Sequence, residues 1–468
     1  MKKIILIFLQ LILMNSINSQ VFDVQNIQYK GDQNKFINIV ILGDGYTVNE
    51  QQIFIDKATI LTNDLFSQSP WSNYKNYFNV YAIKVISLES GVKHPNNLAE
   101  CVSAGVPFSN PNNYFGSTFD YFGIHRLVVP INSQNITNVL ANNLPNYDIV
   151  IIIANSPYYG GSGGSRALAT TNVNSKEILI HELGHSVGIL ADEYYAGDAY
   201  VGEKANMTQV TNPSLIKWKN WLTTPQIGIN SYGNSGISNT WFKPTSNTCK
   251  MQILGVPYCS VCKEKLIENI HVKANPVVSY NPSNITTINS LNQFLNFSLT
   301  ELMKPIPNTL TINWQLDTTI FNNNLENFQV DQNNLSNGTH TLTATVVDET
   351  SFVKTDNHNT IHFNTVTWTI QKNSLGVSTV AESNQIGISV FPNPSTDKIN
   401  IEIDLEKSSN LSIELVSIDG KIIKTSPNKN VLEGKTINSF DISNLASGNY
   451  IFSIKINGAN YSKIFVKQ

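Results

Sequence analysis

The sequence predicts a multidomain protein in which an α+β domain with a mixed sheet is followed by two β-sandwich domains. Three observations support this class. In the first part of the chain, apolar runs typical of strands alternate with an amphipathic helix, as in a sheet covered by helices. From about residue 274 the composition shifts to threonine, asparagine and alternating apolar residues, which is typical of short strands. The 468 residues leave room for two to four domains.

Charge and the N-terminal residues limit the class of protein. The net charge of −3 argues against a nucleic-acid partner, and the hydrophobic content of 41% indicates an ordered globular protein. Lys2 and Lys3 precede an apolar run over residues 4–14, which predicts a secretory signal peptide over residues 1–19. This run is too short for a transmembrane helix, and no later segment is long enough. We therefore expect an exported protein that is not transmembrane.

The first elements of the α+β domain follow a strand–helix–strand order. Residues 36–42 predict a strand, residues 49–67 a helix that Pro70 ends, and residues 77–88 a second strand. The apolar side of the helix consists of Ile53, Ala58, Leu61 and Leu65. This order indicates a mixed sheet with helices packed on it.

The next segments lead toward the centre of the predicted domain. His94 lies in a loop; a lone histidine is usually structural, and the alternative is a contact with substrate or metal. Residues 148–154 form a continuous apolar run, as expected of a strand inside a sheet. Residues 166–171 are expected to form either an edge strand beside a substrate cleft or an ordinary surface hairpin.

Residues 181–185 read His-Glu-Leu-Gly-His, the motif around which the predicted function is built. Side chains four apart share one face of a helix, so His181 and His185 can bind one zinc ion at roughly 2.0–2.1 Å each. Glu182 lies one step round the helix, where it can take a proton from a water molecule on the open position. The motif therefore predicts a metal-assisted peptide hydrolase with Glu182 as its catalytic residue.

The surrounding residues favour a helix at this motif. Asn174 is expected to cap its start, with Glu177 returning the bond as in a capping box, and Gly188 allows the chain to turn away. The helix gains an apolar face from Ile178, Leu179, Leu183 and Val187.

A zinc site of this kind needs a third protein ligand. The metzincin pattern places it ten residues after the first histidine, but Ala191 occupies that position and cannot bind metal. Asp192 is the preferred third ligand and Glu193 the alternative, with a more distant Asp, Glu or His also open. Either acid could instead cap the turn or orient a histidine. Tyr194 could donate a phenol to a developing oxyanion or simply pack.

Met251 and the four cysteines each have two interpretations. Met251 lies where a metzincin would have its Met-turn, or it fills space in the core. In an oxidising compartment Cys101, Cys249, Cys259 and Cys262 are expected to form disulfides, for which three pairings exist. The alternative is a second, structural zinc on Cys249, Cys259 and Cys262, for which no fourth ligand is evident nearby.

Together these residues resemble the IgA-peptidase family of zinc metallopeptidases over roughly residues 36–269. The matching pieces are Leu42-Gly43-Asp44-Gly45-Tyr46-Thr47, Glu89-Ser90-Gly91-Val92, His94-Pro95, Gly160-Gly161-Ser162-Gly163, residues 181–194, Cys249-Lys250-Met251 and residues 258–262. The resemblance implies a zincin-like catalytic domain that cleaves peptide bonds with one catalytic zinc ion. The family name does not establish immunoglobulin as the substrate.

The remainder of the chain predicts two β-sandwich domains separated by a linker over residues 373–386. The first, over residues 274–372, resembles the Ig-like region that follows the catalytic domain in the same family. The second, over residues 387–468, resembles the C-terminal sorting domain of type IX secretion cargo, through Phe391-Pro392-Asn393-Pro394, Ser447-Gly448-Asn449-Tyr450 and residues 463–467. This resemblance implies contact with the type IX machinery, and secretion from, or attachment to the outer surface of, a Gram-negative bacterium.

The sequence therefore predicts a secreted zinc endopeptidase of extracellular proteins, with its catalytic domain over residues 20–273. The alternative is a surface adhesin or glycan-binding protein that uses an inactive zincin domain as a scaffold.

Overall fold

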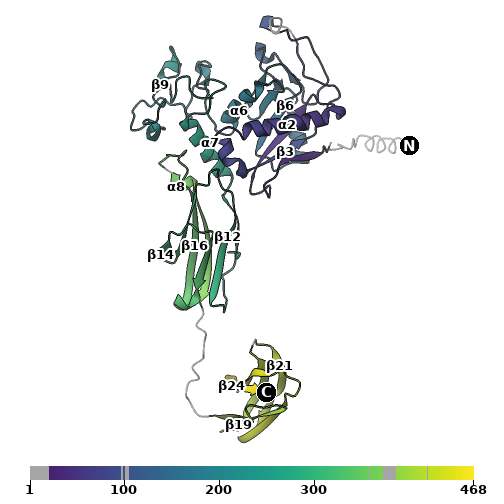
Figure 1. Cartoon of the computed structure of the whole chain (residues 1–468), viewed down its shortest axis with the longest axis vertical. Coiled ribbons are helices and arrows are strands. Elements are labelled where there is room, and N and C mark those ends of the chain that lie inside the picture. The colour runs from purple at the N-terminus through teal and green to yellow at the C-terminus, as the bar shows by residue number, and fades with distance from the viewer. Residues whose placement is uncertain (1–20, 96–97, 101–104, 357, 373–385, 419) are drawn as a thin grey trace, which may run out of the picture. The chain divides into compact units, whose positions relative to one another are not determined.

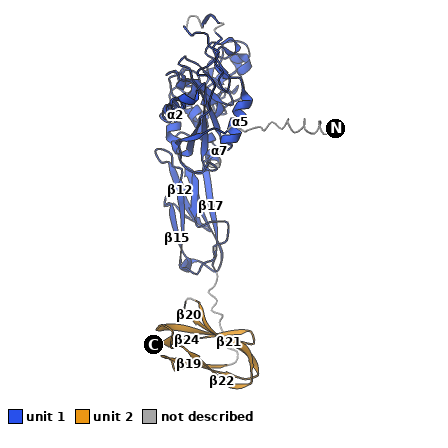
Figure 2. Ribbon diagram, turned by 90° about the vertical axis from the view of Figure 1, so that its right-hand side faces the viewer, with its two compact units in different colours: residues 1–372 blue, residues 373–468 orange. Residues whose placement is uncertain are grey.

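A computed structural model describes residues 21–468 except 96–97, 101–104, 357, 373–385 and 419 (Figure 1). The expected signal peptide, Cys101 and all but the last residue of the expected linker lie outside the described residues. The chain divides into two compact units, residues 1–372 and 373–468 (Figure 2). As predicted, the protein is multidomain, with a mixed α/β sheet first and β-sheet domains after it.

A six-stranded sheet in the order β1-β3-β2-β6-β8-β7 forms the centre of the first unit. Its strands are β1 (Val24–Gln28), β2 (Ile37–Asp44), β3 (Phe78–Ile83), β6 (Ile149–Ala154), β7 (Gly161–Ser162) and β8 (Ala167–Thr170). The four inner strands are parallel, and the two outer strands are antiparallel to their neighbours. Every residue of β2, β3 and β6 is buried, because helices and loops cover both faces of the sheet.

Alternate residues of the inner strands supply two separate cores. Ile39 and Ile41 face the core shared with α2 (Gln51–Leu65), α6 (Ser175–Ser186) and α7 (Ser260–Lys273). Val40 and Leu42 face the opposite core, which includes α5 (Ser133–Asn143). The side-chain period of two along a strand produces this division. The sheet thus holds α6 against one of its faces.

Two details of the predicted elements are wrong. Ile53 is 49% exposed, because Phe54 rather than Ile53 shares the buried face of α2 with the predicted Ala58, Leu61 and Leu65. Residues 166–171 do not form an edge strand, since β8 pairs with β6 on one side and with β7 on the other. The outermost strand is instead β7, where Gly161 also bridges to Leu127.

The second part of the first unit consists of two sheets that enclose one core. One sheet has the order β11-β12-β15 and the other β14-β13-β16-β17. Their bounds are β11 (Val277–Asn281), β12 (Phe294–Leu302), β13 (Leu310–Leu316), β14 (Thr319–Phe321), β15 (Asn327–Asp331), β16 (Gly338–Asp348) and β17 (Phe363–Lys372). Trp314 and Trp368 stack at the centre with ring centroids 5.7 Å apart.

Asp348, at the end of β16, joins these sheets to the first part of the unit. Its Oδ2 accepts hydrogen bonds from the Tyr74 hydroxyl at 2.7 Å and from His271 Nε2 at 2.9 Å, and its Oδ1 accepts one from Thr309. The ring of His362 lies 4.1 Å from that of His271. The expected boundary at residues 273/274 follows the last residue of α7, but both sides of it pack within one compact unit.

The second unit is also built from two sheets, in the orders β18-β19-β22 and β21-β20-β23-β24. Its strands are β18 (Gly387–Phe391), β19 (Lys398–Leu405), β20 (Ser409–Ser417), β21 (Ile422–Val431), β22 (Gly434–Asp441), β23 (Gly448–Ile456) and β24 (Ala459–Lys467). Ile399, Ile401 and Ile403 alternate along β19 and point into its core. In the part of the chain that the structure describes, no helix has the length and apolar character needed to cross a membrane.

Candidate metal centre

The helix α6 follows β8 and carries the His-Glu-Leu-Gly-His motif. Its start differs from the predicted capping box, because Asn174 makes no side-chain capping bond. Instead, the side chain of Asn172 accepts a hydrogen bond from the Asn174 backbone N–H at 3.0 Å. The Glu177 carboxylate turns to Lys250 and to the Gly255 N–H. It therefore ties the helix to the loop around Lys250 rather than closing a cap.

The two histidines of the motif point their Nε2 atoms the same way, as their four-residue spacing requires. Their rings lie 4.9 Å apart. His181 Nδ1 donates to the Lys250 carbonyl at 2.9 Å, and His185 Nδ1 donates to the Leu190 carbonyl at 2.8 Å. A carbonyl can only accept, so these bonds place a proton on each Nδ1 and turn each Nε2 toward Asp192. That is the arrangement of a metal-binding histidine.

Asp192 completes the group. Its Oδ1 lies 3.0 Å from His181 Nε2 and 3.2 Å from His185 Nε2, yet this buried atom has no partner in hydrogen-bonding geometry. Three possible ligand atoms thus face one point. Burial opposes the charge on Asp192, but the two histidines hold its pKa well below the usual range. Burial would likewise lower the pKa of His185, but Asp192 raises it to about 9. Two imidazoles and a carboxylate are a donor set that suits zinc.

A tight turn after α6 brings Asp192 back to the helix. The Ile189 N–H bonds to the His185 carbonyl at 3.0 Å, which is the bond of an αL capping motif, and the Leu190 N–H bonds to the Gly184 carbonyl at 3.1 Å. The residue with left-handed backbone is Ile189, at φ 53°, and not the predicted Gly188. Gly188 is required for a different reason, since a Cβ there would lie 2.6 Å from the Gly184 carbonyl.

Glu182 stands beside the two histidines, with a carboxylate oxygen within 4.8 Å of a ring nitrogen of each. Its Oε2 is 4.0 Å from His185 Nε2. Burial raises the pKa of its carboxyl group, and the two histidines oppose this shift. The carboxylate lies against the backbone of Gly163, where a Cβ would overlap it. Glu182 therefore occupies a fixed place at the wall of the site.

A hollow of about 470 Å³ opens onto these side chains. It is lined by Ile124, Arg126, Leu127, Tyr159, Gly161, Ser162, Gly163, Ile178, His181, Glu182, Tyr194, Lys250, Gln252 and Leu254. The Tyr194 ring stacks on His181 with centroids 6.3 Å apart. Burial and the nearby Asp192 raise the pKa of the Tyr194 phenol, so it keeps its proton. A polar and apolar wall around a reactive group is typical of a substrate pocket.

Met251 lies beneath α6, next to the motif. It is fully buried, and a Cβ on Gly184 would lie 2.5 Å from its sulfur. Its backbone carbonyl accepts a hydrogen bond from the Glu193 N–H at 2.7 Å. Met251 therefore supports both the motif helix and the segment that carries Asp192.

Two predicted site residues are found elsewhere. The Glu193 side chain turns away from the histidines and joins Cys249, Cys259 and Cys262. His94 is buried with Asp120 and His125, in a group separate from His181 and His185. Alternation explains Glu193: consecutive residues of an extended segment point to opposite sides.

The expected disulfides are absent among the cysteines that the structure describes. Cys249, Cys259 and Cys262 are free, and the sulfurs of Cys249 and Cys262 lie 3.6 Å apart. A disulfide requires about 2.05 Å.

Sequence reasoning missed two contributors to the site. The Lys250 carbonyl orients His181, and no sequence pattern marks a backbone carbonyl for that role. Gly163 provides space for Glu182, and the glycine-rich run around it is a signal that could have identified it.

Comparisons with known proteins cover both ends of the chain. Residues 25–236 match the family model described as IgA Peptidase M64, and residues 389–468 match the Secretion system C-terminal sorting domain. None of the curated proteins matches the chain significantly.

Two solved structures show a low overall likeness to this chain. One is SGBP-B of the Bacteroides ovatus mixed-linkage glucan utilization locus in complex with a mixed-linkage heptasaccharide, at 13% identity and a TM-score of 0.14, covering 41% of this chain and 47% of that one. The other is apo Bacteroides uniformis beta-glucuronidase 3, at 8% identity and a TM-score of 0.14, covering 49% and 28%. The chain thus spans less than half of either relative.

Proposed function

We propose that this chain is a secreted zinc-dependent endopeptidase, on the premise that residues 25–236 match the IgA Peptidase M64 family model and residues 389–468 the Secretion system C-terminal sorting domain. The M64 domain supports a peptidase, and the sorting domain indicates secretion or attachment to the cell surface. The observation that carries the zinc proposal is the convergence of His181 Nε2, His185 Nε2 and Asp192 Oδ1 beside Glu182. An unpartnered buried carboxylate oxygen between two imidazole lone pairs fits a cation.

His181, His185 and Asp192 would hold the ion, with the Lys250 and Leu190 carbonyls orienting the two rings. A zinc ion held by these residues would supply Lewis-acid chemistry for the scissile carbonyl and for an attacking water. Glu182 accepts the proton of the attacking water and delivers it to the leaving amine. Its raised pKa suits this exchange, because a carboxyl group must both take and release the proton near neutral pH.

The hollow beside Glu182 is where the substrate backbone would lie. Tyr194 keeps its phenolic proton and stands at the wall, where it can donate a hydrogen bond to a developing oxyanion. The substrate proposed is an extracellular protein or peptide. The sorting domain would deliver the enzyme through the type IX machinery to the outer surface of a Gram-negative cell or to the medium.

Two variants of the full chain test the proposal. Glu182→Gln should keep its zinc but lose most of its turnover of casein, because an amide cannot accept the proton. His185→Ala should lose the ion of this site, because a ligand is missing, and should therefore contain one zinc ion fewer per chain than the parent. The measurements are zinc content by elemental analysis and the rate of casein cleavage with and without chelator.

The competing function, a surface adhesin or glycan-binding protein with an inactive scaffold, predicts a different result. In that case the parent protein would not hydrolyse unstructured proteins in a chelator-sensitive way. Turnover by Glu182→Gln equal to that of the parent would show that the assigned role of Glu182 is wrong.

A further inference from the structure

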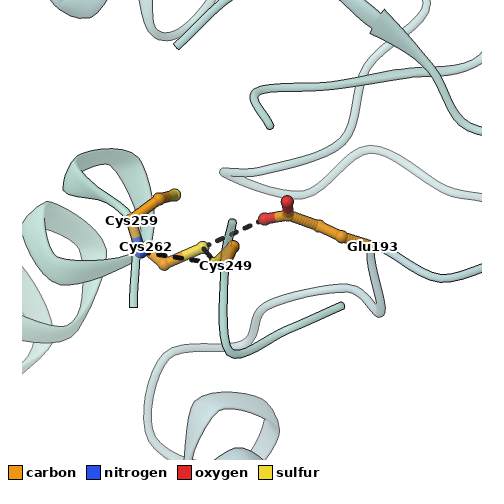
Figure 3. A group of neighbouring side chains, drawn as sticks. All are labelled: Glu193, Cys249, Cys259 and Cys262. Carbon is orange, nitrogen blue, oxygen red and sulfur yellow. Dashed lines mark hydrogen bonds between the residues drawn. The ribbon is translucent and has the colours of Figure 1, made fainter. Parts of the chain in front are cut away.

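A second group of metal-binding side chains lies on the far side of the segment that carries Asp192. Glu193, Cys249, Cys259 and Cys262 each offer a ligand atom, and these atoms lie within 4.8 Å of one another (Figure 3). All four residues are buried. They come from three separate parts of the chain: the turn after α6, the loop before Met251, and the start of α7. We propose that this group is a second, structural zinc site.

The distances fit a tetrahedral ion. With Zn–S bonds of about 2.3 Å, the sulfurs of a tetrahedral site lie about 3.8 Å apart, and a sulfur and a carboxylate oxygen about 3.6 Å apart. The Cys249 and Cys262 sulfurs are 3.6 Å apart, and Cys262 Sγ is 3.3 Å from Glu193 Oε1. The cluster is thus close to its bound geometry before any ion enters.

The spacing and the surroundings of the ligands support the same assignment. Cys259 and Cys262 have the Cys-x-x-Cys spacing of structural zinc sites, and Cys249 precedes them by ten residues. Glu193 is the fourth ligand that the sequence did not reveal. Its carboxylate is oriented by the Asn206 amide on Oε1 and the Thr245 hydroxyl on Oε2, as metal-binding carboxylates usually are.

A bound cation would also balance the charges of the cluster. A buried carboxylate needs a compensating charge, and the ammonium group of Lys243 bonds to the Glu193 backbone carbonyl rather than to its carboxylate. Three thiolates, one carboxylate and Zn²⁺ sum to a charge of −2. Lys243 and Lys263 lie within electrostatic reach of the sulfurs and supply two positive charges. A disulfide would instead pair two sulfurs and give the Glu193 carboxylate no compensating charge.

A zinc ion in this second site would stabilise the geometry of the proposed catalytic site. Glu193 directly follows Asp192, and Cys249 directly precedes Lys250, whose carbonyl orients His181. The Glu193 N–H also bonds to the Met251 carbonyl. One ion bound to Glu193 and Cys249 therefore clamps together the two segments that position the catalytic ligands. On binding, each cysteine releases its thiol proton, because the thiolate is the ligand.

The test counts metal in the full chain when the first site has been removed. A double variant, His181→Ala with His185→Ala, should retain one zinc per chain, against two in the parent. Adding Cys249→Ser should remove the remaining ion, whereas adding Cys101→Ser, a cysteine substitution outside the proposed ligand set, should not.

A second measurement leaves the cysteines intact in case their substitution prevents folding. Replacing the metal of the double-histidine variant with cobalt should produce the near-ultraviolet thiolate-to-cobalt charge-transfer absorption. A double-histidine variant that contains no metal, or that shows a disulfide among Cys249, Cys259 and Cys262 by non-reducing mass analysis, would overturn the proposal. These readouts do not depend on peptidase activity, so the loss of one proposal leaves the other standing.

Discussion

Gly163 is the residue whose smallness matters most to the proposed chemistry. The Glu182 carboxylate occupies the space that a Cβ on Gly163 would need. The overlapping atoms are mainly the far end of a flexible side chain, so the carboxylate can swing aside at little cost in stability. It would then leave the position from which it reaches the attacking water.

We therefore predict that Gly163→Ala lowers kcat/KM for casein by about 100-fold while zinc content stays at the parent level, since a displacement of about 1 Å at a reacting group costs that much. The matched control is Gly202→Ala, because a Cβ on Gly202 meets nothing within 4 Å. Equal activity of Gly163→Ala and Gly202→Ala would contradict the role given to Gly163.

The turn that ends α6 stores backbone strain next to the proposed metal ligands. Ile189 has a φ of 53°, a conformation that costs a side-chain-bearing residue roughly 1–2 kcal/mol. Its side chain is 57% exposed, so little packing offsets that cost. The turn persists because the backbone bonds from Ile189 and Leu190 to α6, and the return of the chain to Asp192, require it.

Ile189→Gly should accordingly raise the free energy of unfolding of the first unit by about 0.5–1 kcal/mol, the relief of strain minus the entropy cost of glycine. Chemical denaturation followed by tryptophan fluorescence measures this, because all six tryptophans lie within residues 1–372. Excess chelator removes bound metal, so that a change in metal affinity does not contribute to the measured free energy of unfolding.

Val173→Gly is the control for this change. Val173 is 74% exposed and is not among the residues with positive φ, so glycine there should only destabilise. If Ile189→Gly decreased the free energy of unfolding by as much as Val173→Gly does, the strain argument would be refuted.

At the scale of the whole first unit, a buried group of histidines next to Asp348 couples stability to pH. Burial, together with His271 and His358, lowers the pKa of His362 from 6.5 to about 3. Neither ring nitrogen of His362 makes a hydrogen bond within the described part of the chain. The folded protein thus keeps His362 neutral at a pH where the unfolded chain takes up a proton. Stability is therefore lost as the pH falls from about 6.5 toward 3.

Replacing the His362 imidazole by a ring that does not titrate should remove this loss of stability at acidic pH. We expect His362→Phe to reduce the decrease in unfolding free energy between pH 6.5 and 4 by up to about 3 kcal/mol. Burial raises the pKa of Asp348, but the hydrogen bond from His271 outweighs it, so the pKa is lowered. Asp348 therefore changes its charge, and with it the stability, only below about pH 4, outside this window. Denaturation curves at several pH values give the slope.

His340 offers a control with the opposite sign. A hydrogen bond to Asp317 raises its pKa, so its contribution is present at low pH and is lost as the pH rises. His340→Gln should still lose unfolding free energy as the pH falls from 6.5 to 4. If the unfolding free energy of His340→Gln stayed constant over this range while that of His362→Phe still fell, the loss could not be assigned to His362.

The sequence by itself determined those features of the protein that depend on local periodicity. The mixed sheet followed by β-sheet domains could be predicted, because strand and helix periods and composition are read along a few neighbouring residues. His181 and His185 converge because four residues make about one turn, and Asp192 is close to them along the chain.

Only the tertiary structure decided what depends on contacts between distant segments. It separated Asp192 from Glu193, brought Glu193 to Cys249, placed β7 outside β8, and set the Lys250 carbonyl behind His181. A residue's neighbours across the fold are chosen by the packing of whole elements, and no spacing within a single segment encodes that choice.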